Sequence, residues 1–156
     1  MNGAIRAAWT ARDAERALPL VSRIAADIAE TNARLADLLQ ALRTARAARV
    51  RARAAGRGRT EGGRRTGAAG GNLEALRVEV AAVSARLEEL LSELAGLGCR
   101  AHGGDGGVDF PAVLDGEPVL LCWRPGEADV RWWHARGAGP RDRVPLPASA
   151  LAEREA

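Results

Sequence analysis

Three polar residues in the C-terminal third are of the types that bind metals or move protons. They are Asp109, Glu127 and His134, and Cys122 falls between them in the sequence. Two carboxylates and one imidazole suit a divalent metal with open coordination positions, as in facial-triad sites. They equally suit acid–base chemistry. In the alternative interpretation they are structural: Glu127 closes a turn, His134 ends a strand and Asp109 caps a loop.

A second set of potential ligands begins with Cys99 and His102, which have Cys-x-x-His spacing. Cys122 and His134 would complete a Cys2His2 zinc site, although this second pair is widely spaced. The alternative is that Cys122 is a small buried side chain and His102 a loop residue. These residues establish no cofactor. A divalent metal is the cofactor that they could hold.

The composition excludes several other kinds of chemistry. All 23 basic residues are arginine, so a lysine-dependent P-loop, Schiff base or general base is ruled out. Two cysteines are too few for a disulfide framework. The first twenty residues are charged without a continuous apolar core, and no apolar run reaches the roughly 20 residues of a spanning helix. We therefore expect a cytoplasmic protein with no membrane contact.

The net charge of +3 conceals two opposite parts. Nine arginines and one glutamate between Arg43 and Arg65 give +8, which leaves 14 arginines against 19 acids elsewhere. Residues 56–71 hold nothing apolar to bury, which predicts a disordered Arg/Gly loop. Such a loop either binds RNA or DNA weakly through phosphates, without interleaved aromatic residues, or is a solvated linker. The candidate nucleic-acid contacts are Arg57, Arg59, Arg64 and Arg65.

Two seven-residue patterns predict the elements that carry these residues. Apolar residues at heptad spacing from Val21 to Ala45 indicate a long amphipathic helix, broken only by Thr31. A second seam from Leu73 to Leu97 has no exception. We expect helix within 10–55 and over 72–97, folded back as a long antiparallel, coiled-coil-like hairpin.

The predicted helix starts follow from short polar signals. Thr10 and Asp13 resemble a capping box that begins a short helix over about 11–17. Pro19 fits the first turn of the next helix, where its missing amide hydrogen costs nothing. Asn72 is the expected cap of the second long helix.

After Gly98 the apolar period changes to two. Residues 118–124 and 130–134 are apolar, β-branched and aromatic, and 125–129 supply a turn, which predicts a β-hairpin. The predicted β-hairpin and its Pro- and Gly-rich tail together occupy residues 108–146. The expected fold is therefore α+β, mainly α, with a small C-terminal β-hairpin in a single domain over 1–156.

Adjacent tryptophans on the second predicted strand must point to opposite faces. One ring of Trp132 and Trp133 therefore packs on the helices, and the other covers the outer face or meets a partner. Residues 148–156 are expected to form a last helical turn. The candidate site also includes Trp123, Trp133 and Arg143.

Several segments resemble the bacterial and archaeal domain-of-unknown-function family 2203. They are Val108–Ala112, Gly116, Leu121–Glu127 and Trp133–His134, together with the opening segments Thr10–Ala14 and Ala17–Val21. The resemblance implies a small helical hairpin with a compact C-terminal β element, and it implies no activity, substrate or cofactor. The chain departs from the family pattern in its long basic loop and in Asp142, which stands before Arg143 where glycine is expected.

These observations favour a non-enzymatic structural or interaction protein. A two-helix hairpin leaves apolar seams partly uncovered, and a two-fold dimer forming a four-helix bundle would bury them. We therefore expect a homodimer. The alternatives are a small metal-binding or acid–base site at Asp109, Glu127 and His134, and weak nucleic-acid binding through the Arg/Gly loop.

Overall fold

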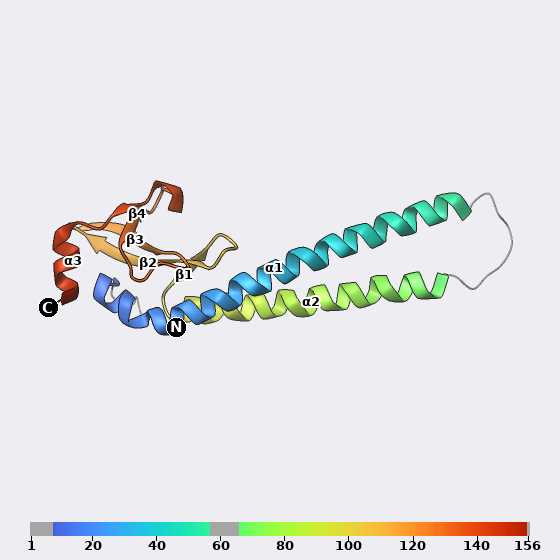
Figure 1. Cartoon of the computed structure of the whole chain (residues 1–156), viewed down its shortest axis with the longest axis horizontal. Coiled ribbons are helices and arrows are strands. Elements are labelled where there is room, and N and C mark those ends of the chain that lie inside the picture. The colour runs from blue at the N-terminus through green and yellow to red at the C-terminus, as the bar shows by residue number, and fades with distance from the viewer. Residues whose placement is uncertain (1–7, 57–65, 156) are drawn as a thin grey trace, which may run out of the picture. The chain divides into compact units, whose positions relative to one another are not determined.

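The computed structural model describes residues 8–56 and 66–155 (Figure 1). Its elements are α1 (Ala11–Gly56), α2 (Thr66–Gly96), β1 (Arg100–His102), β2 (Gly107–Leu114), β3 (Glu117–Trp123), β4 (Trp132–Ala135), the 3-10 turn η1 (Pro140–Asp142), β5 (Val144–Pro145) and α3 (Ala148–Glu155). The contacts divide the chain into two compact units. The sheet unit comprises the residues up to Glu30 and from Glu89 onward, and the helical unit comprises Thr31–Glu88. The single domain expected for 1–156 stays a prediction.

Helix α1 is one uninterrupted helix of 46 residues with Pro19 inside it. The predicted break before Pro19 is therefore wrong. Proline removes one helical hydrogen bond, but the residues on either side bury one apolar face, which favours continuing the helix. Ala14 and Val21 are both fully buried.

The predicted cap of α1 is confirmed. The backbone N–H of Asp13 donates to Thr10 Oγ1 at 3.1 Å, as expected for an N-cap threonine. The Asp13 carboxylate accepts a hydrogen bond of 2.8 Å from the Thr10 hydroxyl, and it adds negative charge at the positive end of the helix dipole.

Helix α2 begins at Thr66, six residues before the expected cap at Asn72. Residues 66–71 are therefore helical, where the sequence predicted loop. A helix already nucleated by the leucine seam can extend through alanine and glycine at modest cost, because elongation adds one hydrogen bond per residue. The rest of the predicted disordered loop, with Arg57, Arg59, Arg64 and Arg65, lies outside the described residues.

In the helical unit the two helices run side by side in opposite directions (Figure 1). Leu42, Leu73 and Val83 are buried there, each from the predicted seams. Arg34 bridges to Glu79 at 2.7 Å between the helices. Both side chains of this pair are exposed, so the bridge adds little to stability, and the buried seam residues hold the helices together.

The sheet unit contains a five-stranded antiparallel sheet in the order β1-β2-β3-β4-β5. The predicted two-stranded hairpin corresponds to β3 and β4, so the expected small hairpin is corrected to a larger sheet. The sequence predicted no strand over the residues of β2, and Pro111 stands in the middle of that strand. The Pro111 carbonyl accepts a hydrogen bond from Trp9 N–H at 2.8 Å on the side away from β3. The proline nitrogen faces that same side, where no ladder bond is needed.

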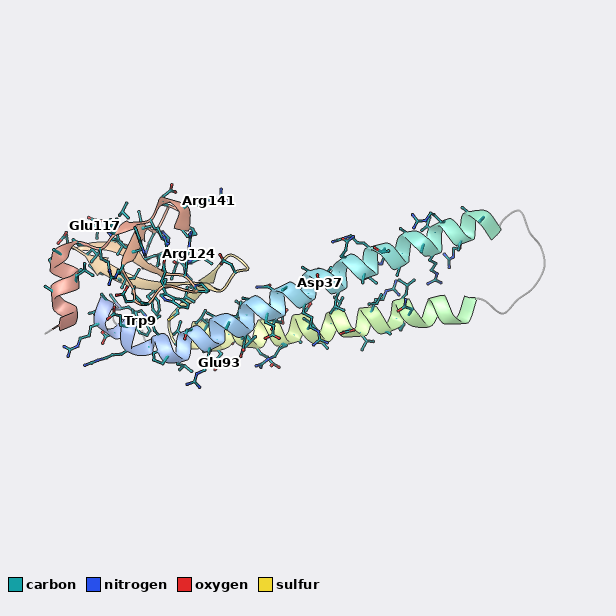
Figure 2. All side chains as sticks on the ribbon, in the orientation of Figure 1. Trp9, Asp37, Glu93, Glu117, Arg124 and Arg141 are labelled. Atoms are coloured by element: carbon teal, nitrogen blue, oxygen red, sulfur yellow. The ribbon has the colours of Figure 1, made fainter. Side chains whose placement is uncertain are left out.

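One face of this sheet forms the apolar core of the unit with residues from both helices. Phe110 and Leu121 are fully buried, as are Ile28 of α1 and Leu94 of α2. The Trp9 ring, labelled in Figure 2, meets Phe110 edge-on with centroids 5.3 Å apart. Its Nε1–H donates to the Gly98 carbonyl at 3.2 Å. Within the described ranges, no helix is both long and apolar enough to cross a membrane.

We predict that Phe110→Ala lowers the free energy of unfolding by about 3–5 kcal/mol, because it opens a cavity at a fully buried position and removes the contact with Trp9. Chemical denaturation followed by tryptophan fluorescence measures this change. Val113→Ala on the same strand is the matched control, since Val113 is 51% exposed and should change stability by only about 0.5 kcal/mol. Equal losses in both variants would contradict this description of the core.

Candidate metal centre

The strand register gathers polar side chains on the sheet face opposite the apolar core. Asp109 of β2 pairs directly with Cys122 of β3, and Cys122 pairs with Trp132 of β4. Directly paired residues point to the same face, and so do residues two apart on one strand. His134 shares this face because it lies two residues after Trp132 on β4. His102 shares it because it pairs with Gly107, which lies two residues before Asp109 on β2.

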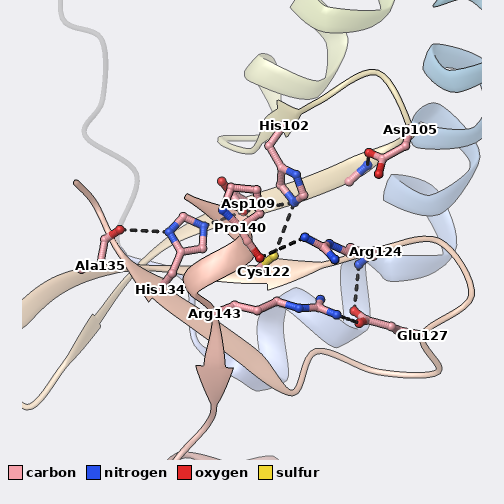
Figure 3. A network of polar contacts seen from close by, with 11 residues as sticks. His102, Asp105, Asp109, Cys122, Arg124, Glu127, His134, Ala135, Pro140 and Arg143 are labelled. Carbon is pink, nitrogen blue, oxygen red and sulfur yellow. Dashed lines mark hydrogen bonds and ion pairs between the residues drawn. The ribbon is translucent and has the colours of Figure 1, made fainter. Parts of the chain in front are cut away.

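Four potential metal donors meet on this face (Figure 3). The Nε2 atom of His102 lies 3.4 Å from Cys122 Sγ and 3.5 Å from Asp109 Oδ1. The same Asp109 oxygen lies 3.3 Å from His134 Nε2. Among the described residues, the donor atoms of His102, Asp109 and Cys122 all fall within 4.8 Å of one another. His134 lies outside this group and contacts it through Asp109.

The His102 ring is held in place by a glycine. A Cβ built on Gly107 would lie 2.1 Å from His102 Cε1 and 2.7 Å from its Nε2. Such contacts are far inside van der Waals distance, so only glycine leaves room for the imidazole at this position. The turn before it is fixed by Asp105, whose Oδ1 accepts the Gly107 N–H at 3.2 Å.

Hydrogen bonding orients the His134 ring. Its Nδ1 lies 2.9 Å from the Ala135 carbonyl, which can only accept, so Nδ1 carries the proton. In the neutral imidazole the Nε2 lone pair then faces Asp109 Oδ1. Two lone pairs at this distance repel unless a proton or a cation lies between them. A histidine that donates one ring N–H to a backbone carbonyl is the usual arrangement for a metal ligand.

Burial sets the protonation of the two remaining donors. It lowers the pKa of His102, and the opposing effect of Asp109 is smaller, so the imidazole is neutral at neutral pH. Burial also raises the pKa of the Cys122 thiol to about 11, helped by the Asp109 charge and opposed by Arg143 and Arg124. Without a metal the thiol keeps its proton, and a bound cation would remove it.

Arg143 and Glu127 form a second layer beside the cluster. Arg143 forms an ion pair with Glu127, and its guanidinium lies over the Trp132 ring, 4.9 Å from the centroid. Its positive charge acts to lower the pKa of the Cys122 thiol. The Glu127 carboxylate also accepts the Arg124 N–H at 2.9 Å. Glu127 therefore closes the β3–β4 turn and anchors Arg143.

The structure thus brings some of the predicted site residues together and separates others. Asp109 and His134 meet, whereas Glu127 contacts Arg143 and the backbone N–H of Arg124 (Figure 3). Of the Cys2His2 set, His102 and Cys122 meet, and Cys99 is buried at the end of α2, where its N–H donates to the Leu94 carbonyl.

The aromatic candidates fall on both sheet faces. Trp133 pairs with Leu121 and Trp123 pairs with Val108, which places both tryptophans on the core face. Trp132 pairs with Cys122 and therefore shares the metal-donor face. Sequence reasoning never combined His102, Asp109 and Cys122 in one site, because only the register of β1, β2 and β3 places them in neighbouring rows.

The spacing within the group of His102, Asp109 and Cys122 suits a zinc ion. Zinc bonds of about 2.0–2.3 Å place neighbouring ligands about 3.3–3.7 Å apart, and His102 Nε2 lies 3.4 Å from Cys122 Sγ and 3.5 Å from Asp109 Oδ1. Thiolate and imidazole donors favour zinc over magnesium or calcium, which take oxygen ligands. Ionised Asp109 and Cys122 together would neutralise a divalent cation.

Comparison with known proteins gives one match. The family model described as "Uncharacterized conserved protein (DUF2203)" matches residues 7–146. No curated protein and no solved structure matches the chain.

The raised pKa of Cys122 predicts a pH dependence for the metal-free protein. The folded state holds the thiol proton more tightly than the unfolded state, so stability is full below pH 9.0 and falls as pH rises toward about 11. Thiolate absorbance of a Cys99→Ser variant measures the pKa of Cys122 directly, and the absence of tyrosine removes the usual interference. A Cys122 thiol titrating below pH 9.0 in metal-free protein would contradict this assignment.

Proposed function

The chain belongs to the DUF2203 family of uncharacterized conserved proteins, and we propose that it is a non-enzymatic binding protein whose sheet is cross-linked by a divalent metal ion, zinc. The observation that carries this proposal is the approach of His102 Nε2 to Cys122 Sγ and Asp109 Oδ1 at 3.4 and 3.5 Å. The ligands are His102, Asp109 and Cys122, and His134 lies outside this group, where it contacts the Asp109 carboxylate.

A structural role suits the burial of these groups. Cys122 is fully buried, and Asp109 and His134 are 5% and 2% exposed. An ion bound among them lies beneath the protein surface, which suits a structural role. The three ligands come from β1, β2 and β3, so one ion ties together three of the five strands. The thiolate ligand requires a reduced Cys122, which accords with the cytoplasmic location expected from the sequence.

We predict that the purified protein binds about one zinc ion per chain, because the described residues form one group of three closely spaced donors. Cobalt substitution should give the thiolate-to-metal charge-transfer band of a cysteine ligand. Zinc should raise the unfolding free energy by about 2.7 kcal/mol at a free concentration one hundred times its dissociation constant.

Matched variants separate this site from the alternatives. Cys122→Ser and His102→Ala should abolish the cobalt band, and His134→Ala should weaken binding about 10–100-fold. Cys99→Ser and Glu127→Gln are the controls and should keep one ion per chain. Metal content unchanged in Cys122→Ser, or lost equally in Cys99→Ser, would refute the assignment.

We further propose that the protein self-associates as a homodimer through its helical unit. The supporting observation is incomplete burial of the seams: Leu38, Leu76 and Val80 are only half-buried. Val78 and Leu39 are 62% and 37% exposed. A second copy packed against these helices would cover them, and a four-helix bundle is the common arrangement for such seams.

Sedimentation should therefore give a dimer at micromolar concentration, and Val78→Glu combined with Leu39→Glu should shift the protein to a monomer, because buried charges at the interface are costly. Val144→Glu is the control, since Val144 is 44% exposed in the sheet unit. A wild-type monomer would exclude the dimer.

A further inference from the structure

The helical unit contains an open groove with a strongly basic lining. Its volume is about 380 Å³, and it lies between the C-terminal part of α1 and the N-terminal part of α2. The lining residues are Arg46, Arg49, Val50, Arg53, Leu73 and Arg77. Four of the six are arginine and none is acidic, so the groove presents positive charge around a small apolar floor.

The arginines of α1 fall on one side of the helix through their spacing. Residues 46, 49 and 53 follow the i, i+3, i+7 pattern of a single helical stripe. Among the described residues, none of these three arginines forms an ion pair, and all three are exposed. Arg77 has one, a loose contact with Glu74 at 3.6 Å between two exposed side chains.

Elsewhere in the same unit an arginine is neutralised across the helices. Arg34 contacts Glu79 at 2.7 Å. No acidic residue follows Asp37 in α1, so the last five turns of that helix carry only positive charge. Like charges on neighbouring turns cost helix stability, and a bound polyanion would remove this repulsion.

We propose that this groove binds the phosphate backbone of duplex nucleic acid. The planar guanidinium group pairs with phosphate through two parallel hydrogen bonds, which makes arginine well suited to this contact. The stripe from Arg46 to Arg53 covers about 10 Å of helix axis, over which each strand of a duplex presents about three phosphates.

The absence of aromatic residues selects the duplex over single strands. The sequence from Thr31 to Glu88 contains no Trp, Phe or Tyr. Proteins that bind single strands stack bases on such rings, so this unit lacks the means. Recognition through phosphates alone is independent of sequence and strongly dependent on salt, and a duplex presents the denser array of phosphates.

The test is fluorescence anisotropy with a labelled duplex of about 20 base pairs, roughly two helical turns, measured over a range of salt concentrations. The full-length protein is compared with a groove variant in which Arg46, Arg49 and Arg53 are changed to glutamine. Glutamine keeps the helix propensity of arginine, and circular dichroism verifies that the helices persist. A charge-matched control changes Arg16, Arg23 and Arg136 to glutamine, which are exposed in the sheet unit.

The groove variant should bind the duplex at least about tenfold more weakly at low salt. The slope of log K against log salt concentration should become shallower by about 2–3, since each lost phosphate contact contributes about 0.9. The control should retain the wild-type affinity and slope.

Four results would overturn the proposal. They are wild-type binding by the groove variant, an equal loss in the control, tighter binding of a single strand of equal charge, and equal competition by polyglutamate. A fourth protein, with Arg57, Arg59, Arg64 and Arg65 changed to glutamine, assigns the remaining affinity to the loop. If binding disappears in that protein and is intact in the groove variant, the groove is not the site.

Discussion

A buried carboxylate, that of Asp109, is the constraint on which the sheet unit depends. An ionised group this far from water is unfavourable unless nearby groups compensate its charge. Its Oδ1 faces the Nε2 atoms of His102 and His134 at 3.5 and 3.3 Å, and Cys122 lies directly across the ladder. Burial lowers the pKa of His102, and the Cys122 thiol is neutral, so neither of these two groups supplies a compensating positive charge. A divalent cation bound by His102, Asp109 and Cys122 would compensate the charge of the carboxylate.

The surroundings of Asp109 are fixed by contacts that themselves have little freedom. Gly107 leaves space for the His102 ring, and the Ala135 carbonyl holds the His134 ring through Nδ1. Arg143 is placed beside the thiol by Glu127 on one side and by the Trp132 ring on the other. A site whose supporting groups are restrained in this way binds a ligand with little reorganisation, because the donors need not be ordered at the moment of binding.

Charge separates the two units as clearly as their folds do. The stretch from Arg43 to Arg65 carries +8, and the rest of the chain has more acids than arginines. The basic pI therefore says little about the sheet unit, whose buried polar residues, Asp109 and His134, lie together in the Asp109 cluster. The helical unit instead carries its arginines on exposed helix positions, where they remain available to an anion.

Local sequence patterns determined the helices, the cap at Thr10 and the antiparallel pairing of β3 with β4, because heptad spacing, capping residues and alternation act over a few residues. The proline in β2 is tolerated because its nitrogen faces away from β3, and only the assembled sheet shows which way that nitrogen faces. The site was predicted only in part: Asp109, His134, His102 and Cys122 were each identified, but in two competing sets with Glu127 and Cys99. Which of them meet depends on strand register, where a shift of one residue would turn Asp109 to the opposite face. Register is set by the packing of the whole sheet, so only the tertiary structure could decide it.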